Sequence, residues 1–426
     1  MIYIIYLPAY IILFYLYFIL KKNINKNIIE IGFLTGLVYF IFIPLSTYLI
    51  NNGYESYDTL ANKSWSDHSK TITQLSINIY LSLFIILNMS MIYIYHFFNK
   101  KSIKRLKNSY LVKKNKLFLI IGITILPILF LELMIPASIV HWYEKAKYLN
   151  SNFGMFAVVI KYLYTSMRFV TLIILINNFK ISKKYLYLYL LLLLAVIDMF
   201  VTGNRIFLVI VVFSTIIQLI IFKKTKTLIV LSFISIPIGM FMIAWAQIRS
   251  LLGNMSLSES METSYKVFEK INFADIVFQL TEGADFLILL SIIRDFGDKF
   301  NYLVGESFLK LFVFPIPRSI YEDKPDSIGR TMGILYQPET DGLALNTTLL
   351  GEEFANFGLF GFLILGLLLI SFHFLRKFSN KNISYYMLPF YFTFPFLMMR
   401  TNVSDVFIQT IVTFFILLIL TKKVQR

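Results

Sequence analysis

The chain has 426 residues, of which 58% are hydrophobic and only 15% are charged. A soluble protein of this length needs more polar surface than that composition supplies. The chain has no cysteine, which excludes disulfides, thiolate chemistry and Cys-ligated metals, and its four histidines are scattered, which argues against a zinc site.

Long apolar runs predict helices that cross a membrane, because a hydrocarbon core of about 30 Å needs about 20 helical residues. About eleven such runs follow one another, which predicts an all-α polytopic bundle. They cover residues 2–20, 29–50, 71–98, 117–136, 155–177, 185–201, 205–222, 227–249, 348–372, 384–400 and 406–421. The first run has no basic segment before it and no small-residue cleavage site after it, so we expect a retained helix rather than a signal peptide.

The segments that connect the predicted spans alternate between rich and poor in lysine and arginine. The segments 21–28, 99–116, 178–184, 223–226, 376–383 and 422–426 hold 23 of them, whereas the short alternate segments 51–70, 137–154, 202–205 and 400–405 hold 6. Basic loops stay in the cytoplasm, so this asymmetry predicts an outer N-terminus and a cytoplasmic C-terminus. The net charge of +16 is therefore mainly a topology signal and does not indicate a nucleic-acid partner.

One connecting segment, residues 251–347, is far longer than the others and carries 8 Lys and Arg against 14 Asp and Glu. Loops of this length commonly have structure and function of their own. Residues 256–300 predict amphipathic helices interrupted at Gly283 and Gly297, and the apolar stretch 308–317 is typical of a helix on the outer leaflet. The predicted division is a bundle at 1–250, an extracytoplasmic loop at 251–347 and a second bundle at 348–426.

Ionisable residues within the predicted spans gather near the outer side. They are Glu132, Lys161, Asp198, Arg205, Arg249, Glu352, Glu353, Arg400 and Asp405, whereas Glu30 and Arg168 depart from the pattern. A chain that alternates direction should distribute such residues equally between the leaflets, so the asymmetry indicates a polar cavity open to the outside. Two other readings stay open: snorkelling toward lipid headgroups, and pairing of Lys161 or Arg168 with Glu132 or Asp198.

Three stretches hold most of the polar chemistry. The first is the tight turn Thr202-Gly203-Asn204-Arg205 between two spans, where Gly and Asn suit the turn geometry. The second is Pro315-Ile316-Pro317-Arg318, followed by Lys324-Pro325, in which prolines stiffen the backbone around two cations. The third runs from Asn346 to Gly361 and sets Glu352 and Asn356 four residues apart, on one face of a helix.

These stretches resemble the Wzy-type O-antigen and capsule polymerases, which join oligosaccharide repeat units in bacterial envelopes. The matching pieces are Gly203-Asn204-Arg205, Ile316-Pro317-Arg318 with Lys324-Pro325, and Gly351-Glu352 with Asn356-Phe357-Gly358 and Gly361. The topology and the long late outer loop are also similar, so the resemblance covers most of the chain. The paired acid Glu352-Glu353 departs from the single acid expected and leaves the choice of catalytic carboxylate between the two open.

The resemblance implies a metal-independent glycosyltransferase of the bacterial cytoplasmic membrane without a cofactor. Such an enzyme moves a growing glycan from undecaprenyl pyrophosphate onto a new lipid-linked repeat unit at the outer face. Its expected partners are that lipid-linked oligosaccharide, membrane lipid and a chain-length-regulating membrane protein. The chain has no Asp-X-Asp sequence, so metal-bound sugar-nucleotide chemistry is not indicated.

Arginine suits a lipid-pyrophosphate leaving group, because its paired donors hold phosphate and stabilise charge as the bond breaks. The hypothesis is that the donor pyrophosphate is held by basic groups from different elements of the outer boundary, with Arg318 also catalytic. The expected binding residues are Arg205, Arg318, Lys324 and Arg400, with Arg249 weaker, joined by Lys161 and Asn356. The alternative is that these side chains make scattered headgroup contacts.

A carboxylate is expected to remove the proton of the acceptor hydroxyl. Glu352 is preferred because it belongs to the third motif, and the other candidates are Glu353, Asp326, Asp198 and Asp405. The alternative is that Glu352 only completes the start of its helix, as acids often do.

Two rival functions remain at this point. An O-antigen ligase performs the same chemistry on another acceptor, but we expect a ligase to use a His in its long outer loop, and residues 251–347 have none. A flippase or transporter of the same glycan would need an aqueous path and charges at both leaflets, which the one-sided charge pattern disfavours.

Overall fold

The computed structural model describes residues 2–50, 74–99, 114–135, 142–182, 184–202, 205–221, 257–268, 273–313, 320–338, 343–379 and 386–424, together with isolated positions between 226 and 316. Across these residues every named element is a helix, from α1 (Ile2–Lys21) to α20 (Val403–Val424), and no β-strand occurs. The all-α prediction is therefore confirmed for the described part of the chain.

Six helices in the described residues are long and apolar enough to cross a membrane, or seven if the bent pair α12 and α13 is one span. They are Tyr3–Lys21 of α1; Ile28–Ile50, made of α2 (Ile28–Leu37), η1 (Val38–Phe42) and α3 (Ile43–Ile50); α5 (Leu75–Phe98); Val159–Ser182 of α7 (Trp142–Ser182); Thr348–Phe378, made of α16 (Thr348–Phe357), η5 (Gly358–Gly361) and α17 (Phe362–Phe378); and Val403–Leu420 of α20. The chain is thus a membrane protein with transmembrane helices.

Four further helices coincide with predicted spans. They are α6 (Lys114–Leu133), α8 (Leu186–Thr202), α9 (Ile206–Ile221) and α19 (Leu388–Met398). The last three are apolar but shorter than the six long helices. The predicted span 227–249 lies almost entirely outside the described residues, so the count of about eleven stays a prediction.

The chain forms two compact units, each built from separate parts of the sequence. The first unit holds Met1–Ile103, Phe273–Phe378 and Phe394–Ile408, and the second holds Lys104–Asn272, Ser379–Thr393 and Gln409–Arg426. Most of the predicted outer loop therefore packs with the first N-terminal helices. The predicted division at residues 250 and 347 separates the chain by membrane side rather than by packing, so these two units do not test it.

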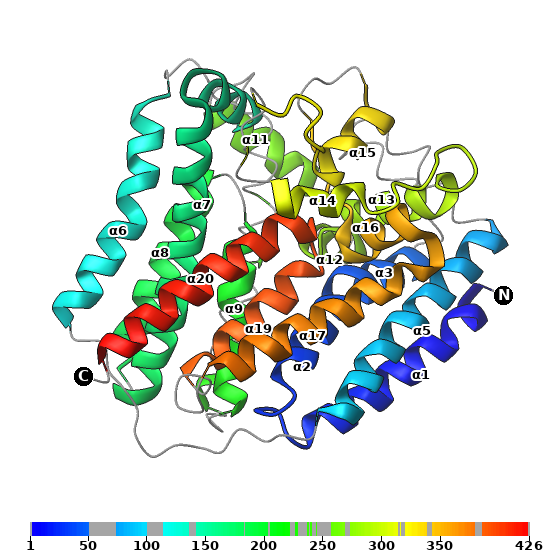
Figure 1. Ribbon diagram of the computed structural model, residues 1–426, viewed down its shortest axis with the longest axis horizontal. Coiled ribbons are helices and arrows are strands. Elements are labelled where there is room, and N and C mark those ends of the chain that lie inside the picture. The colour runs from blue at the N-terminus through cyan, green and yellow to red at the C-terminus, as the bar shows by residue number, and fades with distance from the viewer. Residues whose placement is uncertain are drawn as a thin grey trace. The chain divides into compact units, whose positions relative to one another are not determined.

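In the first unit, α5 packs against α1 and α17, and the three helices run side by side in Figure 1. Outward apolar side chains recur at helical spacing on both flanking helices. On α1 they are Ile4, Leu7, Ile11, Phe14 and Phe18, and on α17 they are Leu363, Leu367, Ile370, Phe374 and Phe378. Stripes of this kind suit contact with lipid chains rather than with water.

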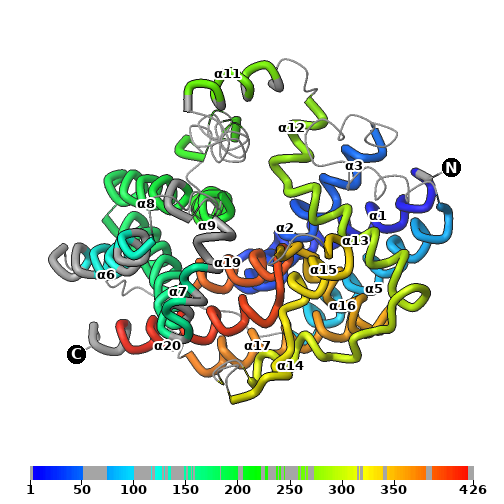
Figure 2. Tube along the Cα trace, turned by 90° about the horizontal axis from the view of Figure 1, so that it is seen from above, coloured from blue at the N-terminus to red at the C-terminus, as the bar shows by residue number. Residues whose placement is uncertain are grey.

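The middle of the predicted loop is buried, which sequence reasoning did not anticipate. Helices α12 (Phe273–Leu280) and α13 (Gly283–Asp295) meet at a bend of 77°. All but two of the 13 residues of α13 are buried, and it lies among α3, α5 and α16 (Figure 2). Its acids made it resemble a surface helix, but Asp295 is buried in ion pairs with Arg294 at 2.6 Å and Lys299 at 3.2 Å.

Two short helices complete the part of the loop that forms the pocket described below. Helix α14 (Glu306–Val313) ends before Pro315, as the prolines predict, and α15 (Ile328–Tyr336) follows it. Leu309 and Phe312 of α14 are exposed, whereas Ser307 on the same helix is buried. Helix α14 is therefore amphipathic, whereas the sequence predicted the stretch 308–317 only as an apolar segment on the outer leaflet.

Candidate functional site

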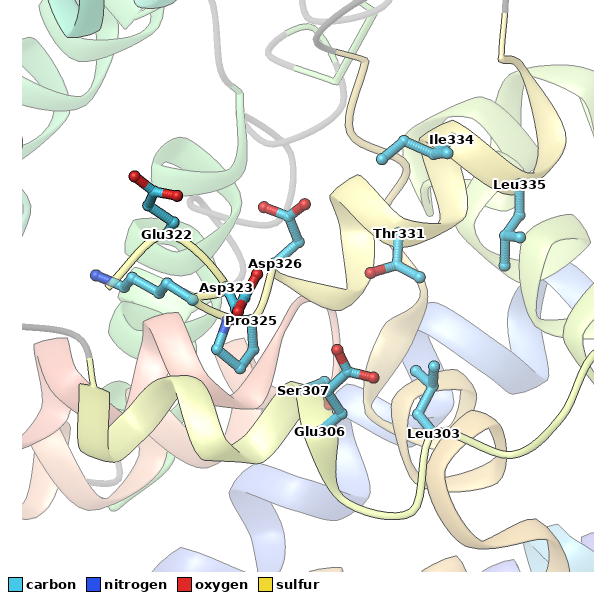
Figure 3. Close-up of a pocket in the computed structure, with 11 residues that line it drawn as sticks. Leu303, Glu306, Ser307, Glu322, Asp323, Pro325, Asp326, Thr331, Ile334 and Leu335 are labelled. Atoms are coloured by element: carbon cyan, nitrogen blue, oxygen red, sulfur yellow. The ribbon is translucent and has the colours of Figure 1, made fainter. Parts of the chain in front are cut away.

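A pocket of about 460 Å³ opens in the first unit between α14, α15 and the segment before α15. Figure 3 shows Ser307 and Glu306 on α14 and Thr331 on α15 at its wall. Its charged lining residues in the described part of the chain are the acids Glu306, Glu322, Asp323 and Asp326 and the base Lys324. Carboxylates accept hydrogen bonds from hydroxyls and repel phosphate, so the pocket suits a sugar better than a pyrophosphate.

The carboxylate of Glu352 lies directly behind this pocket, with no exposed surface. The Ser307 hydroxyl donates to Glu352 Oε1 at 2.8 Å, and the backbone N–H of Val403 donates to Oε2 at 2.6 Å. Both oxygens of this buried carboxylate thus accept a hydrogen bond from the protein. Ser307 both lines the pocket and contacts Glu352.

Asn356 holds this arrangement in place from one turn further along α16. Its Nδ2 donates to Ser307 Oγ at 2.9 Å and to the Glu352 backbone carbonyl at 2.7 Å, while its Oδ1 accepts from the Gly305 N–H at 3.0 Å. The two hydrogens and the oxygen of this amide are thus all used in hydrogen bonds within the protein. Asn356 therefore orients Ser307, and the predicted direct contact between Asn356 and substrate stays a prediction.

Glu352 lies on α16, but its carboxylate caps the start of a different helix, α20. Helix α16 begins at Thr348, which puts Glu352 beyond its first turn, whereas Val403 is the first residue of α20. The alternative that Glu352 completes the start of its own helix is therefore wrong. An acid at the start of α20 satisfies one of the unpaired N–H groups that every helix has there.

The neighbouring acid, Glu353, has different surroundings. It is also fully buried and lies next to the Asn88 amide, yet its carboxylate accepts no hydrogen bond of normal geometry from the described residues. Gly361 packs against it so closely that an added Cβ would lie 2.3 Å from the Glu353 carbonyl oxygen. Gly361 of the third motif therefore allows the backbone to pack closely against Glu353.

The predicted phosphate-binding cations in the first unit have protein partners. Arg400 donates to Glu282 Oε2 at 2.9 Å, in a largely buried pair, and Lys324 Nζ donates to the Ile316 carbonyl at 2.9 Å. Lys324 lines the pocket, and Arg400 is not among the lining residues. The structure therefore does not gather these two cations around one described cavity.

In the second unit, Arg168 and Asp198 form a buried pair, as one of the alternatives proposed. Arg168 Nη1 lies 3.0 Å from both oxygens of Asp198, and the Tyr164 hydroxyl donates to the same carboxylate. Lys161 is exposed, and Arg205 is half-buried just before α9. Arg249 and Arg318 lie outside the described residues.

Sequence reasoning missed Ser307, Lys310 and Glu282. Lys310, one turn after Ser307 on α14, pairs with Asp405 at 2.9 Å, so two of the three polar residues of the helix contact other helices. Their spacing of three residues in an apolar helix was a usable signal. Among the described residues, no group of three His, Asp or Glu side chains is arranged to hold a metal ion.

Two of the three motif stretches thus meet in the first unit. Lys324-Pro325 lines the pocket, and Glu352 with Asn356 reaches the same pocket through Ser307. Arg205 of the remaining stretch belongs to the second unit. Comparison with family models, curated proteins and solved structures found no match to this chain.

Proposed function

We propose that this protein is a membrane glycosyltransferase that polymerises undecaprenyl-pyrophosphate-linked repeat units on the outer face of the bacterial cytoplasmic membrane. The observation that carries the proposal is the contact between a sugar-sized polar pocket and a buried carboxylate, through Ser307. Apolar helices that suit lipid contact also support a lipid-linked substrate. The resemblance in the three motif stretches supplies the reaction type.

In this proposal the acceptor sugar occupies the pocket, where carboxylates such as those of Glu306 and Asp326 accept hydrogen bonds from its hydroxyl groups. Glu352 is the general base. The donor pyrophosphate is held outside the acidic pocket, with Arg318 as the main group and Lys324 at the rim. Arg205, Arg249 and Lys161 of the second unit stay candidates from the sequence alone. Arg400 contributes only after its guanidinium exchanges Glu282 for phosphate.

The proposed topology has about eleven spans, with residues 251–347 outside the cytoplasm. Reporter fusions after Lys107 and Lys224 are expected to give a cytoplasmic signal, and fusions after Ser64 and Asp298 an outside signal, because the basic segments stay in the cytoplasm. Alkaline phosphatase and green fluorescent protein fusions measure this in living cells. A cytoplasmic signal at Asp298 would place the pocket on the wrong side and overturn the proposal.

Arg318→Lys and Arg205→Lys are each expected to impair polymerisation while leaving the protein level unchanged. Lysine keeps the charge but loses the two-pronged donor geometry that holds phosphate. Glycan electrophoresis of complemented cells measures the chain lengths. Lys377→Arg, which changes an exposed cation on the predicted cytoplasmic side, serves as the control, and wild-type chain lengths in both Arg-to-Lys variants would exclude the arginine clamp.

Deletion of the gene followed by glycan electrophoresis tests the function itself. Loss of a polymerase leaves single repeat units at the cell surface. A flippase deletion instead leaves none at the surface, and a ligase deletion leaves polymer that is not attached to its final acceptor. Either of the latter two patterns, or an unchanged polymer, would contradict the proposal.

A further inference from the structure

Ser307 occupies a place between the pocket and the proposed base. Glu352 has no exposed surface, so a bound acceptor sugar cannot reach its carboxylate directly in this structure. Ser307 shows 2% of its surface and lines the pocket. Figure 3 shows Ser307 at the wall of the pocket. Its hydroxyl is hydrogen-bonded to Glu352 Oε1 and therefore offers a path for a proton from a sugar hydroxyl to the buried carboxylate.

The hydrogen bonds of Ser307 point in one direction. A serine hydroxyl has one hydrogen to donate and two lone pairs that accept. Asn356 Nδ2 donates to Ser307 Oγ at 2.9 Å and takes one lone pair, and the hydrogen goes to Glu352 Oε1 at 2.8 Å. The Asn356 amide cannot turn over, because its Oδ1 accepts the Gly305 N–H at 3.0 Å. The second lone pair of Ser307 is left to accept from the pocket.

We propose that Ser307 relays the proton of the acceptor hydroxyl to Glu352, with Asn356 as the residue that positions it. This inference rests on the proposed glycosyl transfer and names the group that touches the substrate. It makes Ser307 the catalytic residue in contact with the sugar and Glu352 the final proton acceptor behind it.

The step balances as follows. The acceptor oxygen forms a bond to the anomeric carbon of the donor, and the bond from that carbon to the pyrophosphate oxygen breaks, so the pyrophosphate leaves with the electron pair. The acceptor proton moves to Ser307 Oγ while the proton of Ser307 moves to Glu352. Glu352 becomes neutral, and the negative charge that it loses appears on the leaving pyrophosphate. Glu352 later returns the proton through Ser307 to solvent.

The relay is tested by variants of Ser307 in the full-length protein, reconstituted with lipid-linked oligosaccharide extracted from the deletion strain. Ser307→Ala is expected to lower turnover about 100-fold or more with an unchanged KM, as loss of a proton-transfer group does. Ser307→Thr keeps the hydroxyl and is expected to recover most of the turnover. The wild-type reaction is expected to slow in deuterated water, and the residual reaction of Ser307→Ala to lose that effect.

A matched control separates the relay from a purely structural role. Ser82 is also buried, and its hydroxyl donates to the Ile5 carbonyl at 2.8 Å, so Ser82→Ala removes a comparable hydrogen bond away from the pocket. It is expected to keep wild-type turnover and the isotope effect per folded molecule. If Ser307→Ala retains wild-type turnover and isotope effect, the relay is wrong while the polymerase proposal stands; if the wild-type protein forms no polymer from the extract, the function itself is wrong.

Discussion

Glu352→Gln is expected to abolish polymerisation, with turnover reduced by about 10² to 10⁴, the usual contribution of a general base. The amide cannot take up the acceptor proton. The amide also has only one acceptor oxygen. The two carboxylate oxygens of Glu352 accept hydrogen bonds from the Ser307 hydroxyl and from the Val403 N–H. We therefore expect a stability loss of about 1–3 kcal/mol, because one buried donor loses its partner. Turnover per folded molecule in liposomes measures the first effect, and thermal unfolding in detergent measures the second.

The control for this variant is the next residue along the same helix. Glu353 is equally buried, but its carboxylate accepts no hydrogen bond of normal geometry from the described residues, so Glu353→Gln removes no such bond. We expect Glu353→Gln to keep polymer formation. Polymer from Glu352→Gln with an inactive Glu353→Gln would move the base by one residue, and polymer from both variants would remove the base from this helix.

Arg168→Leu is expected to lower the free energy of unfolding by about 3–5 kcal/mol, because it leaves the Asp198 carboxylate buried without its counter-charge. Asp198 is 1% exposed, and the guanidinium also lies against the rings of Phe169 at 5.3 Å and Phe207 at 5.0 Å. Denaturant titration in detergent measures the change. The purified yield of folded protein gives an independent estimate.

The double variant Arg168→Leu with Asp198→Leu is expected to recover much of the lost stability, since apolar side chains can replace a buried ion pair. This outcome would assign the pair to the structure of the second unit. A double variant that folds normally but no longer forms polymer would instead give the pair a functional role. Unchanged stability in Arg168→Leu would contradict the buried-pair argument altogether.

The helices of the bundle follow from the sequence where apolar runs are long. The predicted runs 2–20 and 71–98 correspond closely to α1 and α5. The breaks inside helices are harder to predict, because they depend on single backbone angles. Gly358 has φ 57° and ψ −139°, a conformation that favours glycine, and it divides the predicted span 348–372 into α16 and α17.

Local pairs at the site were predictable, and distant pairs were not. Glu352 and Asn356 were placed on one helix face, and Asn356 indeed donates to the Glu352 carbonyl. Ser307 is 45 residues away from Glu352, and Glu282 is 118 residues away from Arg400, so no spacing rule connects them. The burial of α13 was missed because Asp285 and Asp295 gave it the composition of a surface helix, although both are buried.

Reconstitution of the purified protein tests the polymerase proposal most directly. The deletion strain is expected to accumulate the lipid-linked repeat unit, which can be extracted and added to liposomes that contain the wild-type protein alone. The account predicts a ladder of products that differ by one repeat unit, formed without added sugar nucleotide. Single repeat units that persist in these liposomes, while wild-type membranes convert the same extract into a ladder, would contradict it.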